Sequence, residues 1–157
     1  MTVRAVGDHV RDLLNHQSIG NFQEMQAYSE LPPLAQSAVH PQVFIWPGSG
    51  VEKRESMPRG MGLKQATHQF GIYVLIAMKP TDVLSFRDLI EGIMRILRTS
   101  PLPVRGITDV VTGETSDIMS IGEGMRYTYE APKTLKTQRL MEYVGSIEAE
   151  IVEYFRA

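Results

Sequence analysis

The chain has 157 residues, of which 43% are hydrophobic, and its 16 basic and 18 acidic residues give a formal net charge of -2. A chain of this length and composition is expected to fold as one packed domain, and its charge gives no general attraction to nucleic acid or to an anionic membrane. The sequence contains no cysteine, which excludes disulfides, thiolate zinc ligands and a cysteine nucleophile. No stretch approaches 18 consecutive apolar residues, so we expect neither a membrane span nor a signal peptide.

Residues 2–16 are predicted to form an amphipathic helix. Its apolar residues recur at helical spacing and share one stripe: Val3, Val6, Val10, Leu13 and Leu14. The segment that follows, residues 17–40, predicts an irregular crossing over the domain. Within it NFQEMQAY is compatible with one or two helical turns, and LPPL ends any helix because proline lacks an N–H group and restricts the residue before it.

Two strand patterns flank the next segment. QVFIWPG, residues 42–48, predicts a short strand that ends at Pro47 and Gly48, because this dipeptide marks a turn. Residues 66–79 predict the longest strand, since one set of alternate residues, beginning at His68, is almost wholly apolar. Between the two strands GVEKRESMPRGMG, residues 50–62, is too long for a hairpin turn and predicts a long loop.

The stretch KPTDVLSFRDLIEGIMRILRTSPLP predicts the main helix. One stripe collects its apolar residues: Phe86, Leu89, Ile90, Ile93 and Leu97. Gly92 costs this helix about 1 kcal/mol relative to alanine and indicates close packing. Residues 104–114 and 116–130 predict two strands around a turn at Thr112 and Gly113. Residues 139–155 fit both a half-buried strand and a helical stripe, and we favour the strand because Tyr, Val and Ile dominate it.

The order of these elements predicts an α+β fold: a mostly antiparallel β-sheet with helices packed on one face and a long loop between the first two strands. We expect a single domain over residues 1–157, with the N-terminal helix at 1–16 and the sheet and main helix within 39–155. Edge strands in such a sheet must be covered or paired, and assembly into a ring is one way to pair them.

Few side chains suggest chemistry. The four histidines are His9, His16, His40 and His68, and none belongs to an HExxH zinc motif. The sequence also lacks a G-x-S-x-G elbow and a P-loop. For His68 we favour a half-buried polar position at a strand end over a role as ligand or base. We therefore expect no catalytic residue, no metal site and no cofactor.

The long loop is the candidate functional segment. It contributes the following side chains to a possible contact with a neighbouring subunit or with the lumen of a ring: Lys53, Arg54, Met57, Arg59, Met61 and Lys64. Glu52 and Glu55 dilute its positive charge, and nucleic-acid sites usually show a stronger basic stripe with aromatic residues between the charges. Glycine hinges and adaptable methionines therefore favour an arm that contacts another protein.

Three stretches carry a resemblance to a known family. HPQVFIWPG resembles its first strand, ATHQFGIYVLIAMKPTDVLSFRDLIEGIMRIL its core strand and helix, and GMRYTYEAPKTLKTQRLMEYVGSIEAEIVEYF its closing strands. In this order and pattern the chain resembles the tail terminator and tail-completion (head–tail joining) proteins of tailed bacteriophages. The likeness spans most of residues 39–155 and includes no short diagnostic motif.

The resemblance implies a virion structural protein that caps the tail tube and joins tail to head. It implies a homo-oligomeric ring, commonly a hexamer, without catalysis or cofactor. The implied partners are other copies of the chain, the tail tube protein, a head-completion or neck protein, and a sheath protein if the tail is contractile. DNA would only pass through the lumen, no membrane is involved, and assembly would take place in the host cytoplasm before the protein joins the virion.

Other functions stay open from the sequence alone. Head-completion, neck and minor tail proteins share related layouts. A small hydrolase would use His68 or His40 with a carboxylate, and would place the histidine beside an acid in a concave site. A nucleic-acid-binding module would bind DNA with a steep dependence on salt.

Overall fold

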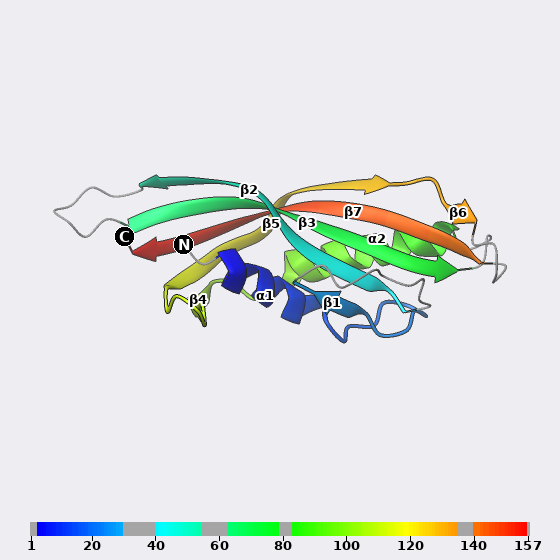
Figure 1. The fold of residues 1–157 in the computed structure, drawn as a ribbon, viewed down its shortest axis with the longest axis horizontal. Helices are drawn as coiled ribbons and strands as arrows, with labels where there is room; N and C mark the ends of the chain where they lie inside the picture. Colours follow the sequence, from blue (N-terminus) through cyan, green and yellow to red (C-terminus); the bar gives the residue numbers. More distant parts are fainter. Residues whose placement is uncertain (1–2, 30–39, 55–62, 79–82, 135–139, 157) are drawn as a thin grey trace.

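The computed structural model of the chain describes residues 3–29, 40–54, 63–78, 83–134 and 140–156 (Figure 1). The elements in chain order are α1 (Val3–Leu14), β1 (Gln26–Tyr28), β2 (Gln42–Arg54), β3 (Leu63–Met78), α2 (Val83–Thr99), β4 (Val104–Thr108), β5 (Thr115–Tyr129), β6 (Lys133–Thr134) and β7 (Met141–Arg156). All strands join one seven-stranded sheet in the order β1-β2-β3-β7-β5-β4, and β6 pairs with β7 beside this path.

The fold class predicted from the sequence is confirmed. Among the described strands only β1 and β2 pair in parallel, and the other pairs are antiparallel. Both helices lie on the same side of the strongly twisted sheet, with α1 against β1 and β2 and α2 against β5 and β7 (Figure 1). The predicted stripe of α2 is buried, as are Val6, Val10 and Leu14 of α1. The core therefore lies between one face of the sheet and the two helices.

The centre of the sheet is a long ladder between β3 and β7. These strands pair antiparallel without interruption from Leu63 opposite Arg156 to Met78 opposite Met141. Alternate residues of both strands face the helices, and Phe70, Ile72 and Ile147 are fully buried there. The period-two prediction is confirmed for residues 66–78, and residue 79 lies outside the described residues. The choice of strand over helix for the last segment is also confirmed.

The predicted end of the first long strand is wrong. β2 does not stop at Pro47 and Gly48 but continues to Arg54, with a bulge between Pro47 and Ser49 in its pairing with β3. Proline is tolerated here because the bulge lies in a stretch of β2 whose outer side pairs with no described strand. Residues 50–54 of the predicted loop at 50–62 are therefore strand, and residues 55–62 lie outside the described residues.

The helical turns proposed for NFQEMQAY are wrong, because residues 21–25 form a turn and irregular chain without a helix. Gln26, Ala27 and Tyr28 form β1, which pairs in parallel with the start of β2. The side-chain oxygen of Asn15, just after α1, accepts a hydrogen bond of 3.1 Å from the N–H of Ala27. Residues 30–39 of the predicted irregular crossing lie outside the described residues.

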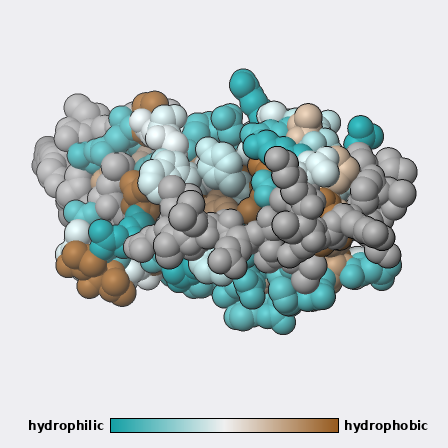
Figure 2. All heavy atoms as spheres, turned by 45° about the vertical axis from the view of Figure 1, so that its right-hand side comes forward, coloured by the Kyte–Doolittle hydropathy of each residue, from teal (hydrophilic) through white to brown (hydrophobic). Residues whose placement is uncertain are grey.

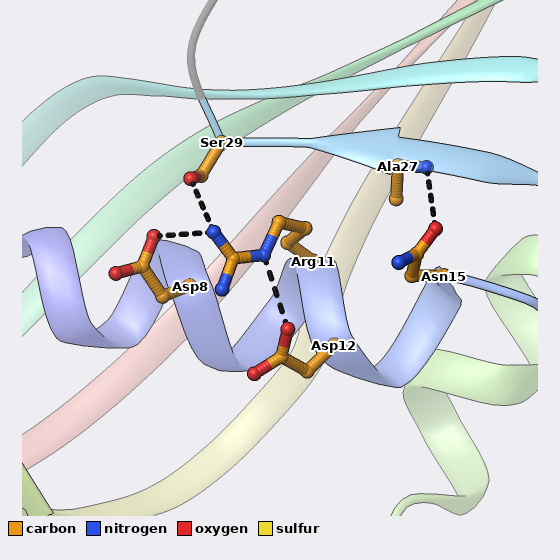
Figure 3. A network of polar contacts seen from close by, with 6 residues as sticks. All are labelled: Asp8, Arg11, Asp12, Asn15, Ala27 and Ser29. Carbon is orange, nitrogen blue, oxygen red and sulfur yellow. Dashed lines mark hydrogen bonds and ion pairs between the residues drawn. The ribbon is translucent and has the colours of Figure 1, made fainter.

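A second polar contact ties α1 to the same edge of the sheet. Figure 3 shows the Arg11 guanidinium between Asp8 and Asp12, with its Nη1 also directed at Ser29 just after β1. The distances are 3.3 Å to Asp8, 3.0 Å to Asp12 and 3.0 Å to the Ser29 hydroxyl. These bonds hold β1 in place although it has only three residues in the sheet.

The strand predicted at 104–114 is shorter in the structure. β4 ends at Thr108, and the next residues form a turn held by the Asp109 carboxylate, which accepts N–H groups of Val111 at 2.8 Å and Thr112 at 3.1 Å. Gly113 follows with a φ of 72°, a conformation that favours glycine. The turn predicted at Thr112 and Gly113 is thus confirmed. The predicted strand ends before this turn, where the side chain of Asp109 accepts the backbone N–H groups.

The close packing indicated by Gly92 is confirmed. A Cβ atom at this position would lie 2.6 Å from Cγ2 of Ile19, which belongs to the segment after α1. Gly92 therefore lets the segment that follows α1 approach the middle of α2. This contact joins the segment after the N-terminal helix to the main helix. The sequence patterns of the two segments do not predict that they are in contact.

Candidate interaction surface

The predicted loop residues fall at the projecting end of the β2–β3 hairpin. In Figure 1 this hairpin reaches past the start of α1, and both chain termini lie at the same end of the molecule. Lys53 stands opposite Gln65, and Arg54 opposite Lys64, on paired strands. Three of the six predicted residues are therefore brought together on one rigid ladder. Met57, Arg59 and Met61 lie outside the described residues.

One ion pair reduces the positive charge of the hairpin. Nζ of Lys64 lies 2.8 Å from Oε1 of Glu52, and both side chains are about one-third exposed, at 29% and 38%. The two residues are diagonal neighbours across β2 and β3. A partly exposed pair of this kind contributes little to stability, on the order of 0–1 kcal/mol. Its clearer effect is to neutralise the charge of Lys64 at this end of the hairpin.

His68 lies in the core beside an acid, deeper than the half-buried position predicted. Its Nε2 is 2.7 Å from Oε1 of Glu153 on β7, and the side chains are 5% and 0% exposed. Phe70 contacts the imidazole edge-on, with ring centroids 5.9 Å apart. On its other side Nδ1 faces Gly50, where a Cβ atom would come within 2.9 Å. Both ring nitrogens are therefore closely flanked by protein atoms.

The surroundings of His68 limit its use as a catalytic base. His68 and Glu52 belong to the lining of a shallow hollow of about 240 Å³, whose other walls are Val3 and residues 47–50 of β2. A base must come within hydrogen-bond reach of its substrate. A buried imidazole with Glu153 at one nitrogen and Gly50 at the other instead has the environment of a structural core pair.

The remaining histidines do not gather. His9 is half-buried on α1, and burial lowers its pKa below 6.5 while the charge of Asp12 opposes this shift. His16 is exposed and contacts Glu24. His40 is partly buried, and its Nδ1 has no hydrogen-bond partner among the described residues. Within the part of the chain that the structure describes, no three His, Asp or Glu side chains are arranged to hold a metal ion, and no helix is long and apolar enough to cross a membrane.

The face of the sheet opposite the helices is mixed in character. Trp46 on β2 and Tyr73 on β3 are 45% and 46% exposed there. Toward β5 the same face is polar: Gln69 donates a hydrogen bond of 3.3 Å to Glu150, and Arg126 stands opposite Glu148. A hollow of about 420 Å³ opens among these polar residues. Figure 2 shows hydrophobic surface only as small separate groups on the side it displays.

The structure identifies which strands form the open edges that the predicted sheet implied, namely β2 and β5. Beyond the short β1, the outer side of β2 over residues 45–54 pairs with no strand among the described residues. On the opposite side of the sheet, β4 pairs with β5 only up to Ile118, so residues 119–129 are likewise unpaired on that side within the described chain. Edges of this kind template association with another chain.

Comparisons with known proteins identify no relative of this chain. A scan against models of known protein families finds no match, and a search of curated proteins finds none either. The functional inference therefore rests on the hairpin, the open sheet face and the two edges.

Proposed function

We propose that the chain is a virion structural protein of a tailed bacteriophage, either a tail terminator or a neck (connector) component. In this role it assembles as a ring, with six subunits as the expected number, caps the tail tube and joins tail to head. Its partners are further copies of itself, the tube protein, a head-completion or neck protein, and a sheath protein in contractile tails. The role requires neither catalysis nor a cofactor.

The observation that carries the proposal is the β2–β3 hairpin. Its paired strands continue past the start of α1 beside the end of β7, and residues 46–52 of β2 are exposed there (Figure 1). Exposed strand surface at the end of a sheet is readily buried by contact with another molecule. Val51 at this end is 70% exposed, which agrees with an additional contact there.

The charges near the hairpin suit a surface next to DNA without tight binding. Lys53, Arg54 and Lys64 are accompanied by Glu52, which is paired with Lys64. Each protein cation that replaces a counterion strengthens DNA binding, so a continuous basic surface would hold DNA that must pass through a channel. A weakly basic hairpin is compatible with a lumen position and equally with a neighbouring subunit.

Native mass spectrometry and negative-stain electron microscopy of the purified chain test the proposal. We expect a closed ring with a central channel, and a monomer or a two-fold dimer at every soluble concentration would overturn it. Steeply salt-dependent binding to DNA would instead support a nucleic-acid-binding module. A minor tail or head-completion protein would join a tube or a portal without capping the tube. Adding the purified ring to assembled tail tubes, and observing whether it caps them, distinguishes these roles from that of a terminator.

Removing residues 51–62 tests the role of the hairpin itself. In this variant Gly50 is followed directly by Leu63, and residues 63–67 can form the turn before His68, which pairs with Gly50 in the parent. We expect a folded chain, with parent-like circular dichroism, that no longer forms the ring or caps the tube. Unchanged ring formation and capping would remove the hairpin from the proposal.

A further inference from the structure

The two open edges of the sheet are matched in direction. β2 is antiparallel to β3, β3 to β7, and β7 to β5. It follows that β2 and β5 run in opposite directions on the two sides of the same sheet. A second copy placed so that the sheet simply continues would bring its β5 beside β2 of the first copy in antiparallel orientation, which is the orientation that most pairs of this sheet already use.

We propose that the outer edge of β2 in one subunit pairs with the outer edge of β5 in the next. The partner is a second copy of this chain, and the contact is head-to-tail. Each subunit contacts one neighbour through the edge of β2 and the other neighbour through the edge of β5. Head-to-tail contacts generate closed rings when the rotation between subunits permits it. This inference rests on the proposed ring and identifies the surfaces that build it.

Irregularities limit each edge to a short regular stretch. On β2 the bulge between Pro47 and Ser49 leaves residues 49–54 in regular register with β3. On β5 the bulges between Ile118 and Ser120 and between Ile121 and Met125 leave residues 125–129 in regular register with β7. The two stretches are of similar length. Bulges also discourage unspecific pairing along the rest of an edge, because they twist the strand away from a flat template.

The charges favour β2 against β5 over β2 against a second β2. The regular stretch of β2 contains Glu52, Lys53 and Arg54 and has a net positive charge. Glu123 and Glu130 flank the regular stretch of β5, which contains Arg126, and all three side chains are exposed. Residues 49–54 of β2 have a net charge of +1, which falls to 0 when Glu55 is included, and residues 123–130, at the end of β5, have a net charge of -1. The head-to-tail contact therefore brings together less positive charge than a two-fold β2–β2 contact would.

The free stretches are displaced from one another along the strands. β1 covers the beginning of β2 at residues 42–44, and β4 covers the beginning of β5 up to Ile118. Because the two strands run in opposite directions, these covered parts lie at opposite ends of the sheet. The neighbouring subunit must therefore shift along the strand direction to pair. A constant stagger between adjacent strands is what curves a sheet toward closure in barrels.

Disulfide cross-linking tests this contact directly, because the chain has no cysteine of its own. The variants carry one cysteine on each edge, on the face opposite the helices: Ser49→Cys or Val51→Cys on β2, with Arg126→Cys or Thr128→Cys on β5. Within one subunit β3 and β7 separate the two edges by roughly 14 Å. That is about twice the longest Cα–Cα distance that a disulfide bridges, so every disulfide must join two subunits.

We expect at least one of the four combinations to form a ladder of oligomers on a non-reducing gel after mild oxidation. The matched single-cysteine variants should stay unlinked. A disulfide-linked dimer of the Val51→Cys single variant would show β2–β2 pairing and overturn the proposal. Closed rings by native mass spectrometry, with no ladder from any combination, would overturn this contact while leaving the ring intact. A chain that is monomeric throughout would overturn both.

Discussion

His68 and Glu153 form a buried pair between adjacent strands of the sheet, with Nε2 and Oε1 2.7 Å apart. They are diagonal neighbours, since His68 stands opposite Ile151 and Glu153 opposite Ala66. The pair lies at the end of the core nearest the hairpin, where Phe70 closes it from the helix side of β3. It links the two longest strands at the base of the projecting segment.

We predict that His68→Leu lowers the free energy of unfolding by about 3 kcal/mol, because it removes a hydrogen-bonding partner from a buried carboxyl group. The double variant His68→Leu with Glu153→Leu should lose less than the sum of the two single variants, by at least about 1 kcal/mol. Urea unfolding of the four chains, with equal slopes required for comparison, measures this coupling. Additive losses would show that the two residues act independently.

Protonation of His9 should make the fold less stable in mild acid. Burial lowers the pKa of His9 in the folded state below 6.5, so the unfolded chain binds the proton more readily. The stability contributed by neutral His9 is fully present above pH 6.5 and falls as the pH drops through 6.5 toward the lowered folded-state pKa. His9→Phe should therefore show a smaller loss of Tm than the parent between about pH 7.5 and about pH 5.

An equal loss of Tm in His9→Phe and in the parent over this pH range would contradict the prediction, because His9 would then not account for the acid sensitivity.

Gly92 is predicted to be required for its small size and not for flexibility. Gly92→Ala should gain about 1 kcal/mol of helix propensity, yet the new methyl group would lie 2.6 Å from Ile19 Cγ2. Overpacking of this kind costs roughly 1–3 kcal/mol, so we expect a net loss of stability in thermal or urea unfolding. In an Ile19→Ala background the same change should become stabilising. A loss of equal size in both backgrounds would contradict the steric explanation.

Asp109 should stabilise the turn after β4 through its acceptor oxygen. Backbone N–H groups of Val111 and Thr112 hold the pKa of Asp109 below 3.8, with Arg4 adding to the effect. The stability from the ionised carboxylate is present above pH 3.8 and is lost as the pH falls through the lowered folded-state value. Asp109→Ala should lower Tm at neutral pH, and its Tm should differ less from that of the parent in strong acid.

Asp109→Asn is the matched variant for the turn, since its side-chain oxygen still accepts the same N–H groups. It should retain more of the parent's Tm at neutral pH than Asp109→Ala does. Equal losses in the two variants would show that the carboxylate charge, and not the acceptor geometry, stabilises the turn.

Local patterns in the sequence predicted most of the elements. Three patterns correspond to observed structure: the alternation along residues 66–78, the stripe of Phe86, Leu89 and Ile93, and the turn at Thr112 and Gly113. These features depend on which side of a strand or helix each side chain occupies, and neighbouring residues determine that. The fold class followed from their order.

Two errors show where local patterns are insufficient. Pro47 and Gly48 resemble a turn, but pairing with β3 carries β2 through a bulge at that point. Gln26–Tyr28 has no distinctive pattern and becomes a strand because the start of β2 offers it a parallel edge and Asn15 and Arg11 hold it there. In both places a tertiary contact outweighs the local preference.

The sequence by itself determined the helices, the alternation of β3, the one-sided core and the basic residues of the hairpin, because each depends on side chains a few positions apart. Only the tertiary structure decided the strand order, the contact of His68 with a carboxylate 85 residues away, and the two open edges. An edge is defined by which strand lies beside which. That relation depends on long-range pairing and leaves no periodic signal along the chain.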